Sequence, residues 1–273
     1  AGQIFHHECP GTAWEVTTAR AFHLWALSFC GDVRRMCHVL PEFLDDATKR
    51  GDLLARASLA TFGGPLAWLA DDEPDRAMQQ LQEAMQVWPE TEFHVQHFTA
   101  LAGEVQILLY KGEGRKALET IQAHWRRLSA SLFLNIEAIR IFTRHLRARC
   151  AVGAAVADGQ LGCLSIAERD ASLLQREKAS WAKTMAHHVR AGIAIAHRDH
   201  EAAVEFLQEC IPHLERAHLG LFADASERAL AVLRNDSIAC GDVDQRMVGR
   251  GVKNPARMAF LHFPVIRSCD ELS

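Results

Sequence analysis

Histidine is the residue type here with the widest chemical scope, because fifteen imidazoles are present and each can bind a metal or move a proton. The densest cluster is His6-His7-Glu8-Cys9, and His94 and His97 stand three residues apart, on one face of a helix. Zinc sites usually need four protein ligands, or three and a water, and the His-Glu-x-x-His motif is absent. The sequence therefore predicts no metal site and no cofactor.

One catalytic motif is matched in the sequence, but the residues that should accompany it are missing. His197-Arg198-Asp199 spells the catalytic-loop tripeptide of protein kinases, but the position that should hold a magnesium-binding asparagine is Val204. The glycine-rich loop, the strand lysine and the DFG and APE signatures are missing as well. The glycines around Glu113 lack the spacing of a phosphate loop. We predict no catalytic residues and expect that this chain is not an enzyme.

Arginines form the third chemical pattern. Arg140, Arg144 and Arg147 follow the i, i+4, i+7 spacing of one helical face. Such a stripe is commonly a solvated face. Alternatively it binds carboxylates, because a guanidinium pairs with a carboxylate through two parallel hydrogen bonds. On this second interpretation the candidate partner-binding residues are the three arginines together with His94, Gln96 and His97.

The composition limits the classes of partner and compartment. The chain has 273 residues with a net charge of −4, so it has no basic excess for nucleic acid. No apolar run reaches the roughly 18–20 residues of a membrane span, and the first ten residues lack the pattern of a signal peptide. The eight cysteines form no CxxC pair, which favours a reducing, cytoplasmic compartment.

The elements that must position these residues are predicted to be helices. Apolar residues recur at spacings of three and four, good helix formers dominate, and Gly, Asp and Pro interrupt the pattern at short intervals. Connections of about two to six residues predict antiparallel neighbours. The expected helices span residues 13–29, 33–49, 53–69, 74–88, 92–110, 115–129, 132–156, 163–176, 179–197, 200–217 and 220–234.

Internal repetition favours a tetratricopeptide-like array over an irregular helical bundle. Ala77, Leu81, Ala84 and Pro89 have the spacing of the second helix of such a repeat. Five joints between helices are marked by a turn residue that stands five positions before a helix residue. This helix residue is small at every joint except the first. Successive joints are 41, 40, 50 and 36 residues apart, instead of about 34. The joints pair Gly31 with Met36, Asp72 with Ala77, Gly112 with Ala117, Gly162 with Ala167 and Arg198 with Ala203.

Three regions follow from this pattern. Residues 1–12 are expected to be an irregular N-terminal segment, and residues 13–235 the helical array, an α-solenoid of antiparallel helix pairs. Residues 236–273 are expected to be an irregular link followed by a tail, in which the apolar segment from Met258 to Ile266 docks on the last helices. In such an array the first helix of each pair lines the concave face.

Several segments carry a family resemblance. They are Ala13-Trp14-Glu15-Val16-Thr17-Thr18-Ala19, Leu66-Ala67-Trp68-Leu69-Ala70-Asp71-Asp72, Phe93-His94-Val95-Gln96-His97-Phe98, His145-Leu146-Arg147-Ala148-Arg149 and Gly251-Val252-Lys253-Asn254-Pro255-Ala256-Arg257-Met258-Ala259. In this order they resemble the C-terminal tetratricopeptide-like region of large bacterial serine/threonine protein kinases. The resemblance covers roughly residues 8–260 and implies a regulatory tail.

Two function classes follow. The first is a protein-interaction module that recruits a protein or peptide partner, as the kinase resemblance implies. The alternative is a sensor that holds a small-molecule effector inside a closed superhelix. A deep, partly apolar pocket would favour the sensor, whereas an open groove with a polar floor would favour the interaction module.

Overall fold

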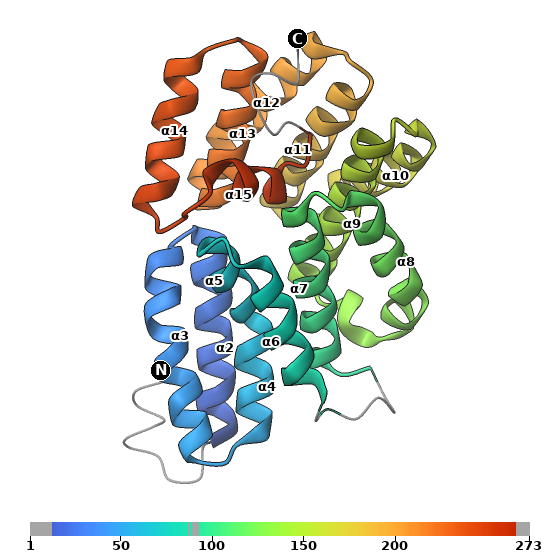
Figure 1. Cartoon of the computed structure of the whole chain (residues 1–273). Helices are drawn as coiled ribbons and strands as arrows, with labels where there is room; N and C mark the ends of the chain where they lie inside the picture. Colours follow the sequence, from blue (N-terminus) through green and yellow to red (C-terminus); the bar gives the residue numbers. More distant parts are fainter. Residues whose placement is uncertain (1–12, 87, 89–92, 266–273) are drawn as a thin grey trace.

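The computed structural model describes residues 13–86, 88 and 93–265, and over these residues the chain is helical without any strand (Figure 1). The predicted all-α class is therefore confirmed, whereas residues 1–12 and the end of the predicted tail lie outside the described residues. The helices are α2 (Ala13–Cys30), α3 (Val33–Lys49), α4 (Leu53–Phe62), α5 (Gly64–Ala70), α6 (Pro74–Gln86), α7 (Val95–Lys111), α8 (Gly114–Ala130), η1 (Leu132–Asn135), α9 (Glu137–Asp158), η2 (Leu161–Cys163), α10 (Leu164–Gln175), α11 (Ser180–Ala196), α12 (His200–Arg216), α13 (Gly220–Leu233), α14 (Ser237–Gly249) and α15 (Pro255–His262).

Many of the turns between helices share one construction. A residue with positive φ ends one helix, and the next residue is an aspartate whose side chain accepts a hydrogen bond from a backbone N–H of the following helix. The first residue reverses the chain, and the second satisfies one of the free N–H groups at the helix start. The pairs are Gly31 with Asp32, Gly51 with Asp52, Arg198 with Asp199 and Asn235 with Asp236.

Four of the five predicted turn positions have the expected left-handed conformation: Gly31, Asp72, Gly112 and Arg198, with φ of 71°, 59°, 79° and 62°. The fifth prediction, Gly162, is wrong, because that residue lies inside η2 and Gly159 has the positive φ instead. All five associated helix residues are buried. Since the same turn also occurs at Gly51 and Asn235, it marks most helix ends and not one end per repeat.

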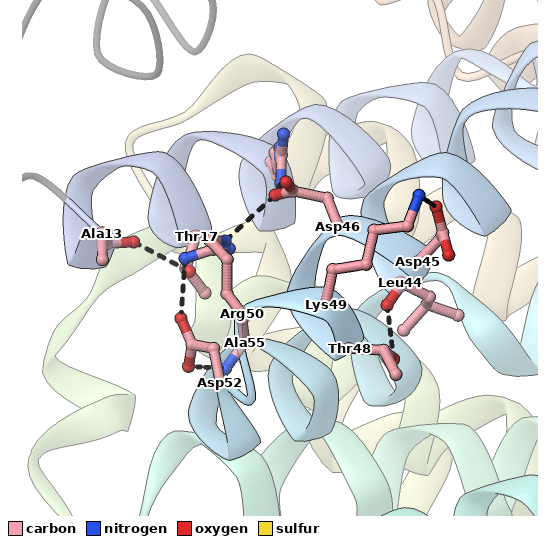
Figure 2. Close-up of polar contacts among 11 residues, drawn as sticks. Ala13, Thr17, Leu44, Asp45, Asp46, Thr48, Lys49, Arg50, Asp52 and Ala55 are labelled. Carbon is pink, nitrogen blue, oxygen red and sulfur yellow. Dashed lines mark hydrogen bonds and ion pairs between the residues drawn. The ribbon is translucent and has the colours of Figure 1, made fainter.

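Figure 2 shows how polar contacts fix the turn between α3 and α4. Asp52 accepts from the backbone N–H of Ala55 at 2.9 Å and from Arg50 Nη1 at 3.0 Å. Arg50 Nε also donates to Asp46 on the last turn of α3, at 3.2 Å. Lys49 pairs with Asp45 at 2.6 Å along the exposed face of α3. The turn is therefore held by its own charges, independently of the core.

The predicted helix over residues 53–69 is broken into α4 and α5 at Gly63. Pro65 causes the break, because it lacks an N–H donor and its ring crowds the carbonyl four residues earlier. Gly63 also packs against Leu24, whose side-chain carbons would lie 3.1–3.3 Å from a Cβ at this position. The predicted helix over 132–156 likewise begins with the short η1 before α9 starts.

The prediction of an irregular link after residue 235 is wrong, because most of this segment forms α14. Asp236 caps this helix, and Cys240, Val243 and Met247 are its buried residues, at helical spacing. Gly241 and the many polar residues of the segment concealed that pattern. Three ion pairs attach α14 to α13: Arg228 Nε lies 2.8 Å from Asp244 Oδ1, Arg246 Nε lies 2.7 Å from Asp224 Oδ1, and Arg246 also pairs with Glu227.

Successive helices pack mainly against their neighbours in sequence, α8 on α9, α9 on α10, α10 on α11 and α11 on α12. An inner layer adds contacts between alternate helices, α2 with α4, α7 with α9 and α9 with α11. Glycine permits the closest crossing, since a Cβ on Gly114 would lie 2.4 Å from the carbonyl carbon of Gly153. The result is a layered arrangement whose inner helices surround a central space.

The C-terminal helices return to the N-terminal ones and close this arrangement (Figure 1). The N–H of Arg34 donates to the carbonyl of Arg250 at 2.8 Å, and the N–H of Lys253 donates to the carbonyl of Ala70 at 2.8 Å. Helix α15 lies between the two halves and contacts α7 and α13. Met258 and Leu261 of α15 are fully buried, so the predicted apolar segment lies in the core as far as it is described.

Asp72 is the polar centre of this closure. Its Oδ1 accepts from Tyr110 Oη at 2.8 Å and from Arg257 Nη1 at 3.1 Å, while its Oδ2 accepts from Asn254 Nδ2 at 3.0 Å. Burial alone would raise the pKa of Asp72, but the hydrogen bonds from Asn254, Tyr110 and Arg257 outweigh it and lower that pKa. One carboxylate thus joins α7 to the segment that begins α15.

Candidate functional site

Two of the predicted partner-binding arginines pair with one glutamate of the same chain. Arg140 donates from Nε and Nη2 to the two oxygens of Glu177, both at 2.7 Å. Arg144 Nη1 donates to Glu177 Oε1 at 2.7 Å. The Arg140 hydrogen bonds lower the pKa of Glu177, so the carboxylate stays charged. These contacts tie α9 to the turn between α10 and α11.

Arg147 is more deeply enclosed, with 9% of its surface exposed. Its Nε and Nη2 donate to the two oxygens of Asp170 at 2.7 and 2.6 Å, and its Cζ lies 3.3 Å from the centroid of Trp125. Burial raises the pKa of Asp170 against the opposing effect of the Arg147 hydrogen bonds. Each arginine of the stripe thus pairs with a carboxylate of the same chain, Arg147 in the core and Arg140 and Arg144 with 23% and 21% of their side chains exposed. For Arg140 and Arg144 the assignment to a solvated face or a partner surface stays a prediction.

The second group of predicted residues lies at the start of α7. Gln96 is buried, with 4% exposure, and its Nε2 donates to Ser58 Oγ of α4 at 2.9 Å. It is thus a packing residue, which corrects its assignment to a partner surface. His94 and His97 are half-buried; the N–H of His94 donates to His97 Nδ1 at 3.1 Å, and their rings stack at 5.8 Å. His97 borders an outer groove of about 390 Å³ between α6, α7 and α8.

The inner helices enclose a different space, a cavity of about 60 Å³ at the centre of the molecule. One ordered water needs roughly 10–15 Å³ on the same measure, whereas a cavity that binds benzene measures roughly 150 Å³, so this cavity has room for a group of a few non-hydrogen atoms. Several lining residues, including Trp25, Phe62 and Phe142, are half-buried, so the cavity reaches solvent. Its six aromatic walls are Trp25, Phe29, Phe62, Phe98, Phe142 and Phe222.

These walls come from α2, α4, α7, α9 and α13. The helices expected to line the concave face were 13–29, 53–69, 92–110, 132–156 and 179–197. The first four each supply at least one cavity residue, whereas residues 179–197 supply none. The rings meet edge to face, with Trp25 and Phe142 at 6.3 Å and Phe98 and Phe142 at 6.4 Å between centroids. Such pairs stabilise one another beyond their buried area, so the cavity has preformed walls.

Polar groups in the cavity wall are few. Thr99 Oγ1 and Thr61 Oγ1 are 2.8 Å apart and also bond to backbone carbonyls of their own helices. Gln106 Nε2 donates to the carbonyl of Ala102 at 3.1 Å. At the α15 end of the cavity stands His262, which is 3% exposed and whose two ring nitrogens have no hydrogen-bond partner among the described residues. His262 is therefore the side chain whose hydrogen-bonding groups are free for a ligand.

Behind His262 lies a buried basic cluster that the sequence did not predict. Phe222 lies 4.7 Å from the ring of His262, and the guanidinium of Arg149 lies 5.3 Å from the ring of Phe222. Arg149 Nη1 donates to the carbonyl of Leu261 at 2.8 Å, and His145 Nε2 lies 3.1 Å from His188 Nδ1. Arg149, His145, His188 and His262 are all at most 3% exposed.

Burial controls the charge of this cluster. It lowers the pKa of His145, His188 and His262, and the positive charge of Arg149 lowers all three further; the pKa of His188 falls to about 3. Burial also lowers the pKa of Arg149 to about 10. At neutral pH the three imidazoles are therefore neutral and Arg149 carries the cluster's single positive charge.

The sequence contained a signal for this site. His262 stands inside the apolar segment from Met258 to Ile266, and Arg149 lies two residues beyond the arginine stripe, hence on another helix face. Polar residues at positions that the pattern assigns to the core are candidates for function. Spacing within one helix could not indicate that the two residues meet, because 112 positions separate Arg149 from Leu261.

Two further classes of site were tested on the described residues. No group of three or more His, Cys, Asp or Glu side chains is placed to hold a metal ion there. Among the described helices none is long and apolar enough to cross a membrane. The sulfur of Cys150 is buried next to Arg149, and burial raises its pKa to about 12, which makes it a poor nucleophile.

Comparison with known proteins gives no indication of the function. No protein-family model, curated protein or solved structure matches this chain. The function is therefore argued from the cavity itself.

Proposed function

We propose that this chain is a regulatory module that binds a small, largely apolar molecule in its central cavity, within a tetratricopeptide-like array that closes on itself. The observation that carries this proposal is the aromatic lining, to which helices from both ends of the chain contribute. A preformed apolar cavity with few polar groups is typical of small-molecule sites. The volume of about 60 Å³ suits a ligand with a short branched chain of a few carbon atoms.

Ligand binding in this place would be coupled to closure. Trp25 and Phe29 belong to α2, whereas Phe222 and His262 belong to α13 and α15, the helices that return to the N-terminal half. A ligand that contacts both groups binds the closed state better than an open one, and so shifts the population towards closure. This is how an effector in the cavity would alter the outer surface of the molecule.

The test is thermal unfolding and Trp25 fluorescence with a panel of short-chain compounds, neutral ones such as isobutanol and acids such as isobutyrate. We expect at least one member to raise the Tm and to change the fluorescence of the wild type but not of Trp25→Phe. Ala102→Leu should weaken binding at least tenfold, because Ala102 lines the cavity and the larger side chain fills it.

The matched control is Ala100→Leu, since Ala100 lies on the same helix but lines the outer groove. It should bind the ligand as the wild type does. If no compound of the panel, neutral or acidic, shifts the Tm or the fluorescence, the cavity is a packing defect and the proposal fails.

A protein-interaction module, as the resemblance to bacterial kinase tails implies, is the second candidate. Two large apolar side chains on α2 support it, Trp14 with 65% and Phe22 with 56% exposure, eight residues or about two helical turns apart. The two candidates are compatible, because an effector in the cavity could control a partner surface. The reading frame upstream of the codon for Ala1 is the test: a kinase domain in the same frame supports a kinase tail, and its absence removes that part of the proposal.

A further inference from the structure

His262 differs from the hydroxyl and amide side chains that line the central cavity. Those of Ser28, Thr61, Thr99 and Gln106 bond to backbone carbonyls of their own helices at 2.7–3.1 Å. His262 is 3% exposed, and neither Nδ1 nor Nε2 has a hydrogen-bond partner among the described residues. Buried polar atoms in native proteins nearly always have a partner, and each one without it destabilises the fold. A hydrogen-bonding group therefore belongs at the α15 end of the cavity.

The imidazole of His262 also determines what that group must do. Burial lowers the pKa of His262 well below its ordinary value, so at neutral pH the ring is uncharged, with one N–H donor and one nitrogen acceptor. A turn of 180° about the Cβ–Cγ bond exchanges the two nitrogens with two ring carbons and keeps the shape of the ring. Either edge can therefore face the cavity. A hydroxyl group matches both nitrogens, because it donates and accepts.

The lining sets the charge of the ligand. Among the described residues that line the cavity there is no Asp, Glu, Lys or Arg. Arg149 lies behind Phe222, with its guanidinium 5.3 Å from the centroid of that ring, and does not reach the cavity. Moving an unpaired charge from water into an apolar site is strongly unfavourable. The cavity therefore favours a neutral molecule over an acid or an amine.

We propose that the ligand of the central cavity is a small neutral alcohol with a short branched carbon chain. Its hydroxyl group forms a hydrogen bond with the ring of His262, and its carbon chain lies against Trp25, Phe98 and Phe142. The volume of about 60 Å³ limits the chain to a few carbon atoms. This inference rests on the proposed function, since it names the chemical class of the same ligand.

The experiment compares isobutanol with isopentane, which has the same branched skeleton and a methyl group in place of the hydroxyl. Affinities for the full chain are measured by NMR titration in sealed tubes. His262→Phe keeps a ring of similar size and removes both nitrogens. It should weaken isobutanol binding about threefold to tenfold, the effect of one hydrogen bond, and should not weaken isopentane binding. Isobutyrate should bind the wild type at least tenfold more weakly than isobutanol.

The matched control is His124→Phe, because His124 lines the outer groove on α8 and not the cavity. It should bind both compounds as the wild type does. A second measurement needs no variant: the NMR chemical shifts of the His262 ring nitrogens should change with isobutanol but not with isopentane.

The outcomes separate this inference from the proposed function. If His262→Phe binds isobutanol as tightly as the wild type, and the ring nitrogens of His262 do not respond, the hydroxyl contact is wrong while the cavity function stands. If isobutyrate binds as tightly as isobutanol, the neutral ligand is wrong. If none of the three compounds binds, the inference and the proposed function both fail.

Discussion

At the scale of single residues, position on the helix decides what an arginine does. Arg144 and Arg147 share one face of α9 and pair with Glu177 and Asp170. Arg149 lies on another face, is fully enclosed and contacts the backbone of α15 and the ring of Phe222. The same side chain thus pairs with a carboxylate at one position and with a backbone carbonyl two residues later.

The buried histidines predict how stability depends on pH. A histidine whose folded pKa is depressed stabilises the protein above its unfolded pKa of 6.5, and that stability is lost as pH falls towards the folded value, about 3 for His188. Between these values each such histidine should lower the free energy of unfolding by about 1.4 kcal/mol per pH unit.

Urea unfolding of the wild type and His188→Gln between pH 7 and pH 4.5 measures this effect. The free energy of unfolding should fall less steeply with decreasing pH in the variant, and the slopes should differ by the contribution of one bound proton, about 1.4 kcal/mol per pH unit. Equal slopes for the two proteins would mean that His188 takes up no proton on unfolding, contrary to its burial.

At the scale of elements, glycines set how closely helices cross. Gly114 at the start of α8 meets the backbone of Gly153 in α9, and Gly103 in α7 meets the ring of Pro65, 2.7 Å from where a Cβ would lie. Neither glycine has a positive φ, so their role is close approach and not turn formation. Because α7 and α9 both line the cavity, these crossings also fix the distance between its walls.

Gly114→Ala should therefore destabilise the protein by about 1–3 kcal/mol or more, because the backbone of α9 must move to admit the methyl group. Gly241→Ala is the matched control: Gly241 lies inside α14 with open space around it, so alanine should stabilise by about 0.5–1 kcal/mol. Chemical unfolding of the two variants gives both values, and a neutral Gly114→Ala would show that the crossing can relax.

At the scale of the whole molecule, closure joins the two ends of the chain. Asp72 links to Asn254 across 182 positions, and α15 packs between α7 and α13. These contacts complete the cavity, since His262 supplies its closed end. The C-terminal segment is thus both a cover for the core and a wall of the candidate site.

Deleting residues 252–273 should lower the Tm, and Leu261→Ala should lower the free energy of unfolding by about 2–5 kcal/mol, because Leu261 is fully buried. The truncated chain should also lose the binding of short-chain compounds in the cavity, because His262 lines it. Calorimetry of both variants measures these effects, and an unchanged Tm after the deletion would refute the structural role of the segment.

The sequence by itself determined the helices and most of their ends. Three local signals mark them: apolar residues that recur with period 3.6, glycines at helix ends, and aspartates at helix starts, such as Asp32, Asp52 and Asp199. Each signal acts through contacts within a few residues of the chain, such as the hydrogen bond from a backbone N–H to the capping aspartate. The same signals were weaker at α14, where Gly241 and polar residues masked the spacing of Cys240, Val243 and Met247.

Only the tertiary structure decided which polar residues meet. Periodicity placed Arg140, Arg144 and Arg147 on one face but did not indicate that Glu177 and Asp170 would neutralise them. Nor did it bring Arg149 to the carbonyl of Leu261, because that contact depends on the chain end returning to α7 and α13. Such contacts between distant segments depend on the summed geometry of every intervening turn, which no single segment encodes; the cavity and its basic end are products of that geometry.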